Sequence, residues 1–215
     1  MTSEQIKQRL INLEKLATIY HTDKGEHGYM PFYAEYLPDQ CRDLLEIGVA
    51  KGGSLRLWNS IFGTDCEIHV LDLFGDPQHV SMRWCRRNEF VPHQGDQSDT
   101  TCLYRELDAK IFDVIIDDGS HKSDDQQISF KHLFINNLRQ GGLYVIEDIF
   151  CCTNKFYWGS VTQYEDTILA AFKEYKKTGK LSNIYFTIGD GCLENIEKIE
   201  ICANEKIAFV WKKSK

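Results

Sequence analysis

The segment FDVIIDDGSH, residues 112–121, runs from branched apolar side chains directly into two acids and a histidine. A short, nearly continuous apolar run is typical of a strand buried in a parallel sheet. In open α/β sheets, ligands bind beyond the carboxyl ends of such strands. The segment is therefore either a buried strand that ends in a polar turn, or a strand whose end carries an active site with Asp117, Asp118 and His121.

The sequence around this strand alternates between strand and helix patterns. Apolar runs predict further strands over residues 43–49, 67–74, 89–96 and 143–149. Helical patterns lie between or after them, over residues 54–62, 77–87, 100–107, 124–142 and 164–177. Such alternation predicts right-handed βαβ units, and hence an α/β fold with a doubly wound, mostly parallel sheet of the Rossmann-like kind.

Both ends of the chain add to this core. Residues 1–20 have helical periodicity, and Thr2 with Gln5 has the spacing of a capping box. Residues 196–213 contain two strand-like runs around Asn204 and Glu205, which predicts a C-terminal antiparallel hairpin. We expect an N-terminal helix and lid segment over residues 1–40, ordered by ligand, and a catalytic domain over residues 41–215.

Composition excludes several classes of function. The chain has 215 residues, 42% of them hydrophobic, and a formal net charge of −7, which argues against a nucleic-acid partner. Neither a secretory leader nor a membrane-spanning run is expected, so a cytoplasmic location is predicted. Without a CxxC pair, the eight cysteines should be reduced and mostly buried. Cys151 and Cys152 lie next to an acidic cluster, where packing is favoured over ligand contact.

The segment EIGVAKGGS, residues 46–54, predicts a glycine loop between a strand and a helix. Gly48 allows a sharp turn, and the following helix offers free N–H groups to an anion. Its GxAxxG pattern also suits a nicotinamide dinucleotide. Asp72 ends the next strand, where an acid accepts ribose hydroxyls or is simply exposed. Asp96 or Gln97, after the following strand, could read an adenine edge.

Two acidic motifs, IDDGSH and VIED, end strands that we expect to be neighbours about 5 Å apart. Asp118, Glu147 and Asp148 would then crowd three carboxylates together, which requires protons or a cation. Hard oxygen ligands suit Mg²⁺. His121 is placed to take a proton from a substrate hydroxyl. The structural alternatives are helix capping by Asp118 and a surface imidazole at His121.

With these motifs and TDKGEHGY (22–29), the chain resembles class I S-adenosylmethionine-dependent O-methyltransferases that act on sugar hydroxyls of mycinamicin, macrocin and novobiocin precursors. The resemblance implies His121 and Asp118 as catalytic residues. It implies Asp118, Glu147 and Asp148 as Mg²⁺ ligands. It implies S-adenosylmethionine contacts from Glu46, Gly48, Lys51, Gly52, Ser54, Asp72, Leu73, Asp96, Gln97, Asp117, Thr22, Lys24 and Tyr29.

The predicted activity is metal-assisted O-methylation of a sugar or sugar-containing metabolite, first of all in a bacterial capsule or surface polysaccharide. An antibiotic glycoside is the alternative acceptor. A nicotinamide-dependent oxidoreductase and a non-catalytic nucleoside-binding module are the rival functions. The expected partner is a small carbohydrate-type acceptor rather than nucleic acid or membrane, and a homodimer or higher homo-oligomer is left open.

Overall fold

The computed structural model describes residues 1–181, 183–186 and 191–214. Its centre is a seven-stranded sheet with the order β3-β2-β1-β4-β5-β7-β6. The strands are β1 Asp43–Ile47, β2 Glu67–Asp72, β3 Val91–Gln94, β4 Phe112–Asp117, β5 Leu138–Ile146, β6 Ile196–Cys202 and β7 Ile207–Lys212. Strand order reverses between β1 and β4, which is where ligands bind in doubly wound sheets.

Pairing along the sheet confirms the predicted topology. The five strands from β3 to β5 are parallel to one another, and β7 is antiparallel to both β5 and β6. Ala203, Asn204 and Glu205 all have positive φ in the turn of the closing hairpin. The hairpin therefore adds one reversed strand, β7, to an otherwise parallel sheet.

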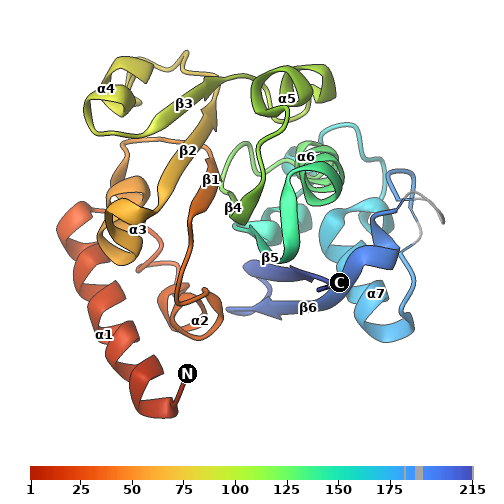
Figure 1. The fold of residues 1–215 in the computed structure, drawn as a ribbon. Coiled ribbons are helices and arrows are strands. Elements are labelled where there is room, and N and C mark those ends of the chain that lie inside the picture. The colour runs from red at the N-terminus through yellow and green to blue at the C-terminus, as the bar shows by residue number, and fades with distance from the viewer. Residues whose placement is uncertain (182, 187–190, 215) are drawn as a thin grey trace.

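Helices cover the sheet on both sides (Figure 1). One side carries α1 Ser3–Tyr20, α2 Met30–Tyr36 and α3 Gly53–Phe62, and the other carries α5 Thr100–Leu107, α6 Ser123–Asn136 and α7 Ile168–Thr178. The short α4, Met82–Arg87, lies beside β3. Short 3₁₀ turns occupy Gly63–Asp65, Ile149–Thr153, Lys155–Tyr157, Tyr164–Asp166 and Leu193–Asn195.

Each side of the sheet has its own apolar core. Trp58 and Tyr33 are fully buried on the α1–α3 side, and Phe130 is fully buried on the α5–α7 side. The α1 helix starts with the predicted capping box of Thr2 and Gln5. Because α1 and α2 share a core with the sheet, the N-terminal segment is held against the strands that carry the acidic motifs.

The helices differ from the predictions at four places. The segment 30–36 is helical, although no helix was predicted between residues 1–20 and residues 54–62. The helix expected from Pro77 begins at Met82, where the Ser81 hydroxyl accepts the Trp84 N–H. The helix expected from residue 164 begins at Ile168, after a 3₁₀ turn, because the Thr167 hydroxyl caps its first turn.

The end of α6 is the largest of these differences. We expected the helix to run to Gly141 and Gly142, but it ends at Asn136 and β5 begins at Leu138. The buried ammonium of Lys212 donates to the carbonyls of Phe134, Ile135 and Leu138 at 2.7–3.0 Å. A residue from the last strand thus satisfies the helix-end carbonyls, and the chain turns into the sheet before the glycines.

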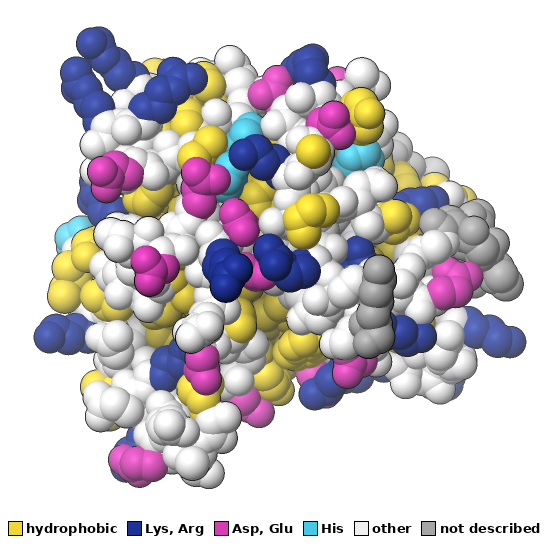
Figure 2. All heavy atoms as spheres, viewed as in Figure 1, with side chains coloured by type: hydrophobic (Ala, Val, Ile, Leu, Met, Phe, Trp, Pro, Cys, Tyr) yellow, Lys and Arg dark blue, Asp and Glu magenta, His cyan; other side chains and the backbone are white. Residues whose placement is uncertain are grey.

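The eight cysteines are free thiols, six buried and two half-buried, so the expectation of reduced, mostly buried thiols is confirmed. No helix in the described residues is long and apolar enough to cross a membrane. The face seen in Figure 2 carries acidic and basic side chains in mixture, with basic ones gathered at the α4 corner, where Arg86 and Arg87 lie.

Candidate active site

The turn after β1 packs directly against the turn after β4. Gly48 has φ +90° and donates its N–H to the Leu71 carbonyl at 2.9 Å. A Cβ at this position would lie 2.2 Å from the Asp118 carbonyl oxygen. Only glycine permits both the backbone conformation and this approach. The glycine loop and the DDGSH motif therefore meet at one end of the sheet, as the sequence predicted.

Asp72 ties this loop to the end of β2. Its carboxylate accepts the Val49 N–H at 2.9 Å and the Phe74 N–H at 2.6 Å. Leu73 is exposed beside it, with 61% of its surface accessible. Gly52, the residue before α3, has φ +73°, and a Cβ there would lie 2.4 Å from the Trp84 ring; Lys51 is exposed. These residues lie at or just after the carboxyl ends of β1 and β2, where a nucleoside was predicted.

A buried lysine holds the acidic residues together. Lys24 is fully buried and donates to Asp118 Oδ2 at 2.6 Å and to Glu147 Oε1 at 2.7 Å. Its Nζ also lies 3.4 Å from Glu46 Oε1. The Ser54 hydroxyl donates to the other Glu46 oxygen at 3.0 Å. One carboxylate from β1 and two from the residues that directly follow β4 and β5 thus surround one ammonium from the N-terminal segment.

Two tyrosines complete this cluster. The Tyr33 hydroxyl donates to Glu147 Oε1, and the Tyr29 hydroxyl donates to Asp148 Oδ1 at 2.5 Å. Both side chains are fully buried. The resemblance placed Lys24 and Tyr29 at the cofactor, whereas in this structure both bond to the acids. Tyr33 was not predicted, and its place in an aromatic stretch gave no signal beyond core packing.

Burial and charge shift the pKa values in opposite directions here. Burial alone lowers the pKa of Lys24, but attraction to Asp118, Glu147 and Glu46 raises it well above the usual range. Burial raises the pKa of Glu46 to about 7, although Lys24 opposes the rise. Burial also raises the pKa of Glu147, again against the attraction of Lys24. Lys24 is therefore a stable cation that opposes, without cancelling, the rise in the pKa of both buried acids.

His121 lies on the outer side of the cluster. Its Nε2 is 3.7 Å from Asp148 Oδ2, and its buried Nδ1 has no partner among the described residues. His121 and Asp148 both have left-handed backbones, with φ +58° and +53°. Such strained conformations concentrate at functional sites. One ligand atom each from Asp118, His121 and Asp148 lies within 4.8 Å of the others, a grouping able to hold a metal ion.

The predicted metal set is only partly reproduced by this grouping. Asp118, Glu147 and Asp148 do gather at one end of the sheet, as expected. Oε1 of Glu147, however, already accepts from Lys24 and Tyr33, so His121 takes its place among the close ligand atoms. The roles of these residues as metal ligands and base remain predictions.

Other predicted cofactor residues make internal contacts. Gln97 donates to both Asp117 oxygens at 3.1 Å and accepts the Ser120 N–H at 2.8 Å. Asp117 is buried and also accepts the Ser129 hydroxyl at 2.6 Å. Asp96 is exposed and bonds to Ser98. Gln97 thus stabilises the DDGSH turn through hydrogen bonds to its Asp117 and Ser120.

Thr22 lies apart from the acidic cluster. It lines a cavity of about 460 Å³ between the end of α1 and the following segment, together with His21 and Asp23. Its N–H donates to the Ala17 carbonyl at 3.2 Å, which continues the end of the helix. Thr22 therefore lies in different surroundings from Lys24, although only Asp23 lies between them in the sequence.

Proteins that resemble this chain in sequence are named as O-methyltransferases. No protein-family model matches the chain. It is 36% identical over 162 residues to demethylmacrocin O-methyltransferase of Streptomyces fradiae, covering 68% of this chain and 38% of that protein. It is 38% identical over 161 residues to mycinamicin VI 2''-O-methyltransferase of Micromonospora griseorubida, covering 68% and 37%. The chain spans under two fifths of the length of these two relatives.

Solved structures agree with the sequence relatives. The MycE methyltransferase of the mycinamycin pathway, in complex with Mg and SAH, has 30% identity and a TM-score of 0.74 over 94% of this chain and 55% of that one. The Podospora anserina methyltransferase PaMTH1 is 16% identical, with a TM-score of 0.55, and shares the fold alone. The Rossmann-like methyltransferase fold is thereby confirmed, and the chain is a homologue of the sugar O-methyltransferases of macrolide and tetracenomycin pathways.

Proposed function

We propose that the chain carries an S-adenosylmethionine-dependent O-methyltransferase activity toward a sugar hydroxyl of a small-molecule glycoside, assisted by Mg²⁺. The observation that carries this proposal is the meeting of the Gly48 loop with Asp118, His121 and Asp148 at one end of the sheet. The relatives named for macrolide and tetracenomycin glycosides favour an antibiotic-type glycoside as acceptor. A capsule or surface polysaccharide, our first expectation, has no such support.

The cofactor would lie over the Gly48 loop and the end of β2. Asp72 has two oxygens that already accept backbone N–H groups, which fixes its position while lone pairs remain for ribose hydroxyls. The exposed Leu73 offers an apolar surface to an adenine ring. S-adenosylmethionine, when bound, supplies an activated methyl group on sulfur. The chain's own contribution is to bind and align the reactants.

A cation would be held by Asp118 and Asp148, with His121 or Glu147 as a further ligand. The donor set fits Mg²⁺ because Asp118 and Asp148 are oxygen donors whose side chains keep 24% and 12% of their surface exposed. Such an ion, when bound, lowers the pKa of a coordinated hydroxyl. Lys24 fixes Asp118 Oδ2 and Glu147 Oε1, so only their remaining oxygens are unconstrained.

His121 is the residue we assign to proton removal. Its side chain is 29% exposed, so a substrate hydroxyl can reach the ring, and Asp148 lies near enough to orient it. A neutral imidazole is matched to general base catalysis near pH 7. A nitrogen that binds the metal cannot accept that proton. The assignment to base catalysis therefore predicts that Glu147, rather than His121, completes the ion's protein ligands.

The acceptor would contact the segment after Asp148. Phe156 is 78% exposed and Phe150 is 37% exposed there. Large apolar side chains at the surface next to a polar site commonly mark a binding surface. They suit the apolar faces of a sugar ring and its aglycone, which supports a glycoside rather than a free small hydroxy acid.

The test is product formation. The full chain with S-adenosylmethionine and Mg²⁺ should release S-adenosylhomocysteine and a methylated product, detected by mass spectrometry, from macrolide glycosides with free sugar hydroxyls. Surface oligosaccharides and nucleotide sugars form the comparison arm. Calorimetry should show S-adenosylhomocysteine binding and no NAD(H) binding. Tight NAD(H) binding would support the oxidoreductase instead, and cofactor binding without transfer to any acceptor would support a binding module.

A further inference from the structure

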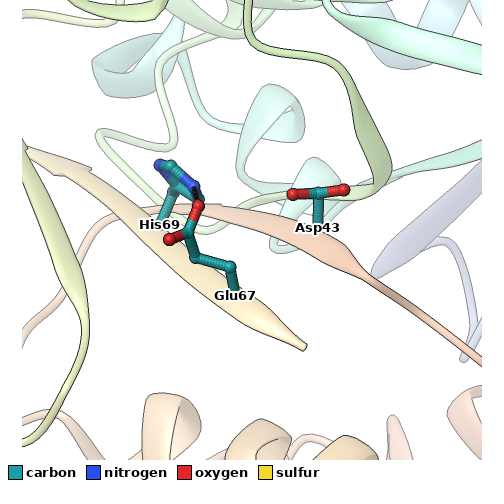
Figure 3. Close-up of side chains that lie close together, drawn as sticks. All are labelled: Asp43, Glu67 and His69. Carbon is teal, nitrogen blue, oxygen red and sulfur yellow. Dashed lines mark hydrogen bonds and ion pairs between the residues drawn. The ribbon is translucent and has the colours of Figure 1, made fainter. Parts of the chain in front are cut away.

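A second cluster of possible metal ligands lies at the amino ends of β1 and β2, whereas the candidate active site lies at the carboxyl ends of the strands. Asp43 and Glu67 start β1 and β2 and are register partners, and His69 follows two residues after Glu67. Side chains two apart in a strand share a face. Figure 3 shows the three side chains gathered on these two neighbouring strands. One ligand atom from each lies within 4.8 Å of the others.

A second histidine, His93, contacts the ring of His69. His69 Nδ1 lies 2.8 Å from His93 Nε2 on β3, and the two rings stack with centroids 5.1 Å apart and an angle of 11°. His69 Nε2 lies 2.8 Å from Glu67 Oε2. Metal-binding histidines almost always donate their other ring N–H to a nearby acceptor. His93 provides such an acceptor, so Nε2 of His69 is the nitrogen turned toward the carboxylates.

The proton positions follow from counting donors. A neutral imidazole carries one ring proton, on either of its two nitrogens. Without a metal, His69 donates from Nε2 to Glu67 and accepts from His93. With a metal on Nε2, His69 donates from Nδ1 to His93 instead, and the His93 proton moves to its own Nδ1. The pair can therefore free the ligand nitrogen without losing a proton.

The local charge also favours a cation. Asp43, Asp113 and Glu67 bring three carboxylates to this end of the sheet. The Arg139 guanidinium contacts two of them, and Lys110 is close enough to act electrostatically on His69. Arg139 lies 2.7 Å from Asp113 Oδ1 but 3.5 Å from Asp43 Oδ2. Glu67 pairs only with neutral His69 in the described contacts, and its side chain is 56% exposed, which leaves room for water ligands.

From this geometry we infer that Asp43, Glu67 and His69 form a second metal site, for a divalent transition metal of the zinc class, with water in the remaining position. One imidazole and two carboxylates are ligands that Zn²⁺ accepts, whereas a hard ion such as Mg²⁺ gains little from imidazole. The site lies about 15 Å from the Asp118 end, the length of the five residues of β1. A metal ion bound there would cross-link β1 and β2 and so stabilise the fold, and it would not take part in methyl transfer.

Zn²⁺ titration tests the site, using calorimetry on the full chain in an Asp148→Asn background. This background weakens the other described cluster that could hold the ion. One equivalent should bind, and Glu67→Gln should weaken it at least about tenfold, since it removes a ligand. His93→Phe keeps the stacked ring but removes the acceptor, and should cost about 10–100-fold in affinity. Glu174→Gln, an exposed acid on α7, is the matched control and should bind as the background does.

A second readout needs no variant that could fail to fold. In the ¹⁵N-labelled natural chain, Zn²⁺ should move the His69 ring proton from Nε2 to Nδ1, as its nitrogen chemical shifts report. A His69 ring that keeps its Nε2 proton in excess Zn²⁺ would overturn the inference. So would equal Zn²⁺ binding by the Glu67→Gln variant and the Glu174→Gln control, or thiolate charge-transfer absorption with Co²⁺, which would assign the ion to cysteines.

Discussion

Replacing Lys24 with methionine should strongly destabilise the fold. The substitution keeps most of the side-chain volume but removes the ammonium that contacts Asp118, Glu147 and Glu46. Glu46 and Glu147 are almost completely buried, so water cannot replace the lost contacts. Removing one partner of a buried ion pair costs about 3–5 kcal/mol, because the remaining charge stays buried without compensation.

The loss should depend on pH in a defined direction. Burial already raises the pKa of Glu46 to about 7 while Lys24 opposes this. Without Lys24, the buried acids would hold their protons to higher pH. A group with a raised pKa in the folded state stabilises it below its ordinary pKa and loses that contribution as the pH rises. The difference between the natural chain and the Lys24→Met variant should therefore be larger at pH 8 than at pH 5.

Urea unfolding followed by tryptophan fluorescence measures this effect. Lys173→Met is the matched control, because Lys173 pairs with Glu205 at the same 2.7 Å distance but both side chains are 40% or more exposed. An exposed pair contributes about 0.2–1 kcal/mol. If Lys24→Met lost no more stability than Lys173→Met at pH 8, Lys24 would not be the internal counter-ion of the cluster.

Four further predictions concern the site and its supports. Chelation of Mg²⁺, or Asp148→Asn, should abolish methyl transfer while calorimetry shows nearly unchanged S-adenosylhomocysteine binding; full turnover in excess chelator would remove the ion from the reaction. His121→Ala should lower kcat by about 10²–10⁴-fold with partial recovery at high pH, and an unimpaired variant would exclude His121 as the base. Gly48→Ala should cost well over the roughly 1–2 kcal/mol expected at Gly179, where φ is also positive but nothing lies within 4 Å; equal losses in urea unfolding would contradict the close contact with Asp118. Glu46→Gln should flatten the dependence of the free energy of unfolding on pH. Burial raises the Glu46 pKa from 4.5 to about 7, so the stabilising contribution of this group is complete below about pH 4.5 and is lost as the pH rises through about 7. An unchanged slope between pH 5 and pH 8 would refute this.

Much of the fold could be predicted because its signals are local. Apolar runs marked the strands, and Asn204 with Glu205 marked the turn of the closing hairpin. The end of α6 could not be predicted, because Lys212, some 75 residues away in sequence, satisfies its last carbonyls. The two glycines that looked like a helix stop instead lie within β5. A local signal for the end of a helix is therefore overridden where a side chain distant in sequence caps the helix earlier.

The same reasoning separates the predicted from the unpredicted parts of the site. Strand ends place Asp118, Glu147 and Asp148 together, because neighbouring parallel strands end at one edge. Lys24 is 94 residues from Asp118 and 123 residues from Glu147 in sequence, and no periodicity links them. The motif resemblance did mark Lys24 as functional, but its contact with the acids became visible only in three dimensions.

The position of Lys24 also divides the acidic residues into two groups. Glu46 and Glu147 face inward, are almost completely buried and share the lysine ammonium. Asp118 and Asp148 keep 24% and 12% of their side-chain surface exposed, on the side where His121 lies. The inner charges are thus met by a cation that belongs to the chain. In the outer pair, Asp118 also contacts this cation through Oδ2 at 2.6 Å, whereas Asp148 contacts the Tyr29 hydroxyl, His27 and His121. Uncompensated carboxylates at an accessible edge are the arrangement that a divalent cation stabilises most. The lysine therefore does not replace the proposed Mg²⁺: it contacts one oxygen of Asp118, which leaves the other Asp118 oxygen and the Asp148 carboxylate for the ion.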